Sequence, residues 1–190
     1  MEHPVTPVYD ANILYPAPLR DLFIRLAYAG LVRARWTAAI HDEWVRNVLK
    51  DNPAIAPARL ARTRALMDAA VRDCLVTGYE GLIESLQLPD PDDRHVLAAA
   101  IRAKAQVIVT FNLKDFQHDV LAGYSIEAQH PDDFPLCLFD DAPRSVCAVV
   151  TRQRQALRNP PKTAEELLAI FESLGLTGFV SRLRQFRESL

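Results

Sequence analysis

Gln106-Val107-Ile108-Val109-Thr110 is the stretch of sequence that decides the fold. Its unbroken apolar centre is typical of a strand that is buried on both faces, as strands are in a parallel sheet. On both sides of it, short β-like runs alternate with helical patterns along the chain. This alternation indicates helices packed on the faces of a parallel sheet, so the sequence predicts an α/β fold.

The predicted elements divide the chain into two parts. The first part, residues 1–140, contains about five predicted strands, at 5–9, 31–36, 74–77, 106–110 and 124–128. Between them the apolar spacing predicts helices at 19–31, 37–50, 58–73, 92–104 and 116–122. Residues 141–190 lack strand patterns and form a predicted helical extension, with helices at 146–157, 163–174 and 178–190.

Composition and charge narrow the class of protein. With 49% hydrophobic and 24% charged residues, the 190-residue chain is expected to fold and to bury a core. Its formal net charge of −2 argues against a protein that coats nucleic acid. Residues 151–190 carry an excess of Lys and Arg, which indicates either a tail that holds an anionic substrate or a solvated helical face.

The sequence also predicts a cytoplasmic location. The longest apolar runs fall short of the roughly 18–20 residues that span a bilayer, so no membrane association is expected. The N-terminus lacks the basic and apolar regions of a signal peptide. Three widely spaced cysteines, Cys74, Cys137 and Cys147, form neither a disulfide framework nor a metal-binding motif, which suits a reducing compartment.

Acidic and amide side chains recur near the ends of the predicted strands. Asp10 follows the first strand and Asn112 the strongest one, while Asp92 and Asp93 begin the helix that precedes the strongest strand. Because the functional crevice of an open α/β sheet lies beyond the carboxyl ends of its strands, we expect these side chains to gather there. Carboxylates without a basic partner are good ligands for Mg²⁺, so the sequence predicts a metal site at this edge.

Two of these acidic groups also have ordinary structural explanations. Glu43 lies on the helix that Thr37 is predicted to cap, and a single helical Glu is usually a solvated charge. An Asp at a helix start caps free N–H groups and suits the positive end of the dipole. However, Asp90, Asp92 and Asp93 together are more than one cap requires.

Taken in order, these stretches resemble the PIN-domain nucleases, in particular the VapC-type toxins of bacterial toxin–antitoxin pairs. The matching motifs are Tyr9-Asp10-Ala11-Asn12, the helical Glu43, Asp93-Arg94-His95-Val96-Leu97-Ala98-Ala99-Ala100, Val109-Thr110-Phe111-Asn112 through Asp115-Phe116, and His130-Pro131-Asp132-Asp133-Phe134. The resemblance covers about residues 5–137. It implies a three-layer α/β/α fold with a central parallel sheet of about five strands and a nuclease domain over residues 1–140. The pattern departs from the family at Asn112, where many relatives have Asp.

The resemblance implies a metal-dependent endoribonuclease that acts on structured RNA, such as transfer or ribosomal RNA. It implies Asp10 and Asp93 as the principal ligands of one or two Mg²⁺ or Mn²⁺ ions, with Glu43 a ligand directly or through water. Asn112 would orient the water or a second ion, and either Asp90 or Asp92 is an alternative to Asp93. The supporting residues are Asn12, Asp92, Thr110 and Asp115. The implied partners are an RNA substrate, a cognate antitoxin protein and, as in many PIN relatives, a second copy of the chain.

Binding an RNA backbone requires cations. The predicted RNA contacts flank the Glu43 helix: Arg33, Arg35, Arg46 and Lys50. His41 and His95 are predicted to have surface or core roles, since the site calls for oxygen donors. Trp36 and Trp44 are predicted to anchor the core, and stacking on RNA bases is their second interpretation.

Two other functions compete with nuclease activity. One is a non-catalytic PIN-like module that binds RNA or a partner, an alternative that the amide of Asn112 favours and the acids oppose. The other is an aspartyl-phosphate phosphatase, which also has an acid after its first strand. That class needs a second Asp where this chain has Asn12, and a downstream Lys that the sequence does not clearly provide.

Overall fold

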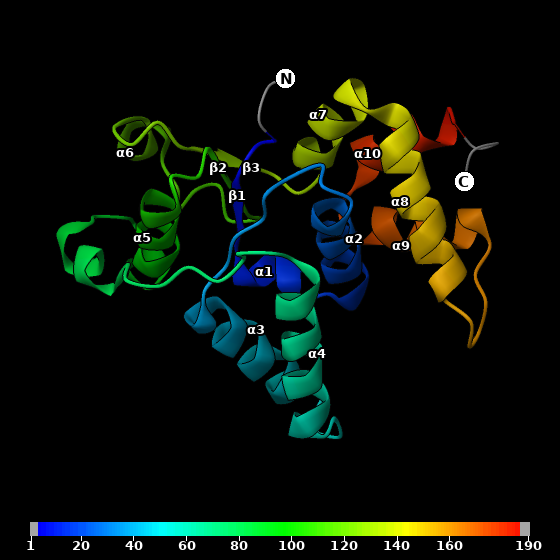
Figure 1. Cartoon of the computed structure of the whole chain (residues 1–190), viewed down its shortest axis with the longest axis horizontal. Helices are drawn as coiled ribbons and strands as arrows, with labels where there is room; N and C mark the ends of the chain where they lie inside the picture. The colour runs from blue at the N-terminus through cyan, green and yellow to red at the C-terminus, as the bar shows by residue number, and fades with distance from the viewer. Residues whose placement is uncertain (1–3, 187–190) are drawn as a thin grey trace.

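The computed structural model describes residues 4–186 of the chain. Its strands form one parallel sheet in the order β1-β2-β3, with β1 at Pro7–Tyr9, β2 at Val107–Val109 and β3 at Glu127–Gln129 (Figure 1). All three run in the same direction, with Val8 beside Ile108 and Ile108 beside Ala128. Their carboxyl ends therefore meet at one edge of the sheet.

In the described residues the sheet has three strands, so the prediction of about five is wrong. The segments predicted as strands at 31–36 and 74–77 make only isolated parallel bridges, Val8 to Arg35 and Trp36 to Leu75. Pro7 accounts for part of this difference. The Val5 carbonyl accepts from the Arg33 N–H at 2.9 Å, but the next bond of this ladder would need an N–H on residue 7, which proline lacks.

The predicted helices of the first 140 residues are present within a few residues of their expected bounds. They are α2 (Ala17–Tyr28), α3 (Ala38–Asp51), α4 (Pro57–Ala70), α5 (Arg94–Ala103) and α6 (His118–Ala122). The structure adds four elements that were not predicted: α1 (Ala11–Leu14), the 3-10 helices η1 (Glu80–Ser85) and η2 (Pro91–Asp93), and α7 (Asp133–Asp141). Thr37 caps α3 as predicted, since its hydroxyl accepts from the Ile40 N–H at 3.1 Å.

Helices cover both faces of the sheet (Figure 1). On one face α5 packs against β1 and β2, and its residues Ala98, Ala99 and Ala100 are fully buried. On the other face the ring of Tyr9 contacts Phe23 of α2 at 5.2 Å and Phe134 of α7 at 6.4 Å between centroids. Because α5 precedes a parallel strand, the helix starts at the carboxyl edge of the sheet.

The C-terminal helices α8 (Pro143–Ala156), α9 (Ala164–Ser173) and α10 (Thr177–Arg184) pack against α2, α7 and one another. Asp132 fixes the start of α10, because its two carboxylate oxygens accept from the N–H groups of Gly178 and Phe179, each at 2.8 Å. The last predicted helix extends over residues 187–190, which lie outside the described part. The domain boundary at 140/141 stays a prediction. Across residues 4–186, every helix is too short or too polar to cross a membrane.

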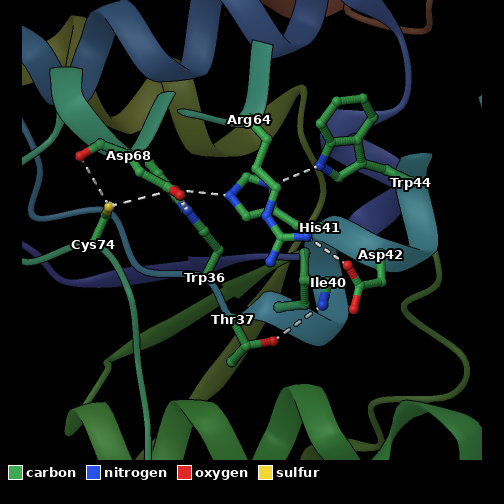
Figure 2. Close-up of polar contacts among 9 residues, drawn as sticks. All are labelled: Trp36, Thr37, Ile40, His41, Asp42, Trp44, Arg64, Asp68 and Cys74. Atoms are coloured by element: carbon green, nitrogen blue, oxygen red, sulfur yellow. Dashed lines mark hydrogen bonds and ion pairs between the residues drawn. The ribbon is translucent and has the colours of Figure 1, made fainter. Parts of the chain in front are cut away.

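A buried polar network holds α3 against α4 (Figure 2). Oδ1 of Asp68 accepts from Nε1 of Trp36 at 2.8 Å and lies 2.9 Å from Nε2 of His41. Nε1 of Trp44 donates to Nδ1 of His41 at 2.9 Å, which assigns the imidazole proton to Nε2. Burial lowers the pKa of His41, which favours the neutral ring. His41, Trp36 and Trp44 are fully buried, which excludes both tryptophans as stacking surfaces for RNA bases.

Candidate active site

Asp10 lies where β1 passes into α1, and it is only 4% exposed. Its Oδ1 accepts from the N–H of Ala11 at 2.6 Å, so the residue caps α1. Its Oδ2 accepts from the Thr110 hydroxyl at 2.7 Å and from Nδ2 of Asn12 at 2.6 Å. Three donors from the ends of two neighbouring strands therefore orient this carboxylate.

The electrostatic environment of Asp10 favours a bound cation. Burial is the largest influence and raises the pKa of Asp10, and the charge of Glu43 raises it further. The hydrogen bonds from Thr110 and Ala11 lower it. A buried carboxylate whose pKa is raised despite these donors would be stabilised as an anion by a nearby positive charge.

Asp93 lies immediately before α5 and is half-buried. Its pKa is raised from 3.8 to about 7, first by burial and then by the charges of Asp10, Asp90, Asp115 and Glu43. Its Oδ2 is buried and has no hydrogen-bond partner among the described residues. An unsatisfied carboxylate oxygen among four other acids is what a divalent metal ion would satisfy, so the residues present fit Mg²⁺ or Mn²⁺.

Glu43 and His95 join the two helices on either side of the site. Nε2 of His95, near the start of α5, lies 3.5 Å from Oε2 of Glu43 on α3. The His95 side chain is 19% exposed, and its Nδ1 is buried without a partner among the described residues. The sequence pattern gave His95 no part in the site, because nothing in it signals a contact between residues on two different helices.

Glu43, Asp93 and His95 line a cleft of about 580 Å³ between α3 and the start of α5. The residues that line it are Ala39, Asp42, Glu43, Arg46, Asp90, Asp92, Asp93, His95 and Asn112. Asp115, predicted as a supporting residue, lies with Asp90 and Asp93, and the three offer oxygens within 4.8 Å of one another. The structure thus places Asp93 beside Asp115 and beside Asp90, one of the two predicted alternatives to Asp93.

Asn112 reaches the cleft from the loop that follows β2. Its backbone N–H donates to the Thr110 hydroxyl at 3.0 Å, and the N–H of Phe111 donates to Oδ1 of Asn12 at 3.2 Å. The supporting residues Asn12 and Thr110 therefore tie the loop after β2 to the loop after β1. Their hydrogen bonds leave the Asn112 side chain free to line the cleft.

The predicted RNA contacts separate into two groups. Arg46 lines the cleft, and Lys50 lines a neighbouring cavity further along α3. Arg33 lies beside the start of β1, away from the carboxyl edge, and the Arg35 guanidinium donates to the carbonyl of Arg72 at 3.4 Å. Neither Arg33 nor Arg35 lines the cleft, so their role in RNA binding stays a prediction.

Comparison with known proteins finds a matching family model for each part of the chain. A model described as a PIN domain matches residues 6–114, and a model described as the VapC50 C-terminal domain matches residues 131–185. The chain is also 46% identical over 91 residues to a protein of Mycobacterium tuberculosis named "Putative ribonuclease VapC50". This alignment covers 48% of the chain and 53% of that relative. The chain therefore spans about half of the relative's length.

The solved structures offer no significant match to this chain. The PIN domain match nevertheless extends over more than half of the 190 residues and includes Asp10, Glu43, Asp93 and Asn112. It also includes all of the sheet except β3. The chain therefore belongs to the PIN domain family.

Proposed function

We propose that this protein is a metal-dependent endoribonuclease that hydrolyses RNA phosphodiester bonds. The observation that carries the proposal is that Glu43 and Asp93 line one cleft, and that the charge of Asp10, from a third element, acts on Asp93 beside it. The charge of Glu43 raises the pKa of both Asp10 and Asp93, and a bound cation would relieve this repulsion. Family membership and the similarity to a protein named as a ribonuclease support the same conclusion.

Asp10 and Asp93 would hold one or two Mg²⁺ or Mn²⁺ ions, with Glu43 binding directly or through water. A bound ion of this kind supplies Lewis-acid chemistry, which acidifies a water molecule and stabilises negative charge on a phosphate. Asn112 would orient the attacking water by its amide, and Asp115 adds a carboxylate beside Asp93.

The other residues of the site act through Asp10 and Glu43. Thr110 and Asn12 fix Oδ2 of Asp10 through two hydrogen bonds, so that the carboxylate need not reorganise during the reaction. His95 restrains the carboxylate of Glu43 from the facing helix. Asp92 is exposed at the rim of the cleft and would have only an electrostatic effect.

The biological role is part of the proposal. We infer that the chain is the toxin of a toxin–antitoxin pair, and that a cognate antitoxin protein covers the acidic cleft and blocks RNA. The similarity of residues 131–185 to the VapC50 C-terminal domain supports this role. A homodimer is the assembly that we expect, since PIN relatives often dimerise.

Cleavage of total bacterial RNA by the purified protein tests the proposal. The wild type is compared in Mn²⁺, Mg²⁺ and EDTA with an Asp10→Asn, Asp93→Asn double variant and with Asp119→Asn, which changes an exposed acid on α6. Discrete, metal-dependent fragments are expected from the wild type and Asp119→Asn alone. Intact RNA in every lane, with RNA binding retained, would instead identify a non-catalytic RNA-binding module.

A further inference from the structure

A second cavity adjoins the acidic cleft and shares a wall with it. It has a volume of about 380 Å³ and is lined by Asn12, Tyr15, Glu43, Asn47, Lys50 and Asp51. Glu43 lines both spaces, and Asn12 is hydrogen-bonded to Asp10 at 2.6 Å. The second cavity therefore opens beside the same carboxylates, on the other side of Glu43.

One face of α3 runs through both cavities. Glu43, Arg46, Asn47 and Lys50 follow one another at helical spacing, and each of them lines at least one of the two spaces. Arg46 belongs to the cleft and Lys50 to the second cavity. They are four positions apart, which corresponds to a rise of about 6 Å along the helix. This separation is of the order of that between neighbouring phosphates on an RNA strand.

The charges on this helix face leave two cations available to a ligand. Arg46 and Lys50 are exposed, and neither is ion-paired with a carboxylate in residues 4–186. The nearby acids have other partners. Asp42 pairs with Arg64 of α4 at 2.5 Å, and Asp51 accepts from the Tyr15 hydroxyl at 2.7 Å.

We propose that the RNA strand lies along this face of α3, crossing Glu43 from the cleft into the second cavity. Arg46 and Lys50 bind two neighbouring phosphates on one side of the scissile phosphate, which sits at Glu43. Asn47 and Tyr15 contact the sugar or base that enters the second cavity. This inference rests on the proposed ribonuclease function, and it adds the path that the substrate takes.

The salt dependence of RNA binding tests the path without requiring cleavage. A fluorescently labelled single-stranded RNA is titrated with protein in an Asp10→Asn background in Mg²⁺, at several salt concentrations. Lys50→Gln and Arg46→Gln should each weaken binding and reduce the slope of log K against log salt by about 0.7, the value for one phosphate on a single strand. The double variant should reduce this slope by about 1.4. Lys50→Arg should keep the original slope, because the charge is retained.

Arg62→Gln is the matched control, since Arg62 is an exposed arginine on α4 that lines neither cavity. Slopes for Lys50→Gln and Arg46→Gln that equal the slope of this control would overturn the inference. Failure of the proposed function has a different signature, namely an unmodified protein that cleaves no RNA in Mg²⁺ or Mn²⁺. If the unmodified protein cleaves RNA but the double variant keeps the original salt slope, the proposed function stands and the proposed RNA path is wrong.

Discussion

The hydroxyl of Thr110 donates a 2.7 Å hydrogen bond to Oδ2 of Asp10, although 100 residues separate the two in the sequence. Both side chains are buried, and the bond joins the end of β2 to the end of β1. It lowers the pKa of Asp10, whereas burial raises it. Thr110 is therefore one of the groups that keep an anion at the centre of the site.

Replacing Thr110 by Val should make Asp10 harder to ionise. We expect the acidic limb of the pH–rate profile to move to higher pH, and stability to fall by about 1–3 kcal/mol because buried partners lose a hydrogen bond. Thr110→Ser retains the hydroxyl and should behave as the wild type. Both effects are measured by RNA cleavage across pH and by urea unfolding. A Val variant with an unshifted profile would show that Asp10 does not depend on this bond.

The raised pKa of Asp93 predicts a pH-dependent loss of stability in EDTA. The pKa is about 7 in the folded state and 3.8 for an ordinary Asp, so between these pH values the folded state binds more protons than the unfolded state. The free energy of unfolding should therefore fall as pH rises through this window. Asp93→Asn should abolish that component and be more stable than the wild type at pH 8.

Urea unfolding of both proteins over a pH series gives the difference curve. Adding Mg²⁺ at pH 8 should stabilise the wild type, because a ligand that binds only the folded state raises its stability. The same addition should have a much smaller effect on Asp93→Asn. Parallel stability curves for the two proteins at all pH values would refute this assignment of Asp93.

His95 should act on metal binding through its contact with Glu43. His95→Leu removes the polar atom that faces Oε2 of Glu43, so we expect cleavage to require a several-fold higher Mn²⁺ concentration for half-maximal rate. His95→Gln keeps a donor at a similar reach and should largely restore the wild-type Mn²⁺ dependence. A uniform loss of rate in both variants, with unchanged Mn²⁺ dependence, would contradict a positioning role.

Gly178 should be intolerant of a side chain. A Cβ there would lie 3.0 Å from Oδ2 of Asp132 and 3.2 Å from Cδ1 of Leu136, so Gly178→Ala should displace the start of α10. Overpacking of this kind costs about 1–3 kcal/mol, to be measured by thermal or urea unfolding. Gly81→Ala is the control, since no neighbouring atom lies within 4 Å of its Cβ position. Equal stability of the two variants would argue against close packing at α10.

The sequence alone predicted the sheet edge that carries the site. The apolar run at Val107–Val109 identifies β2, and the parallel topology then places Asp10 and Asp93 at one edge, because a strand end and a preceding helix start meet there. The small side chains of α5 agree with this placement. These features are local in sequence, so patterns of spacing reveal them.

Other features depend on contacts that no local pattern encodes. The hydrogen bond that is missing at Pro7 reflects the N–H that proline lacks. Its partner segment begins at Arg33, 26 residues further along the chain. The pairing of His95 with Glu43 joins α5 to α3, and Asp68 reaches His41 from α4. Helix α7 is not evident from the sequence because Pro135 stands in its first turn, where proline is tolerated although it usually breaks a helix.

The bond between Asp132 and the start of α10 also has a consequence for biosynthesis. Asp132 follows β3 at the edge of the sheet, yet the N–H groups that its carboxylate accepts belong to Gly178 and Phe179. A ribosome must add 46 further residues after Asp132 before the first of these donors exists. Until then the carboxylate of Asp132 lacks these two donors. The apolar surface of α2 that α8 and α9 cover is also exposed until those helices are made. Final packing of α10 against α7 is accordingly a late event in the production of each molecule.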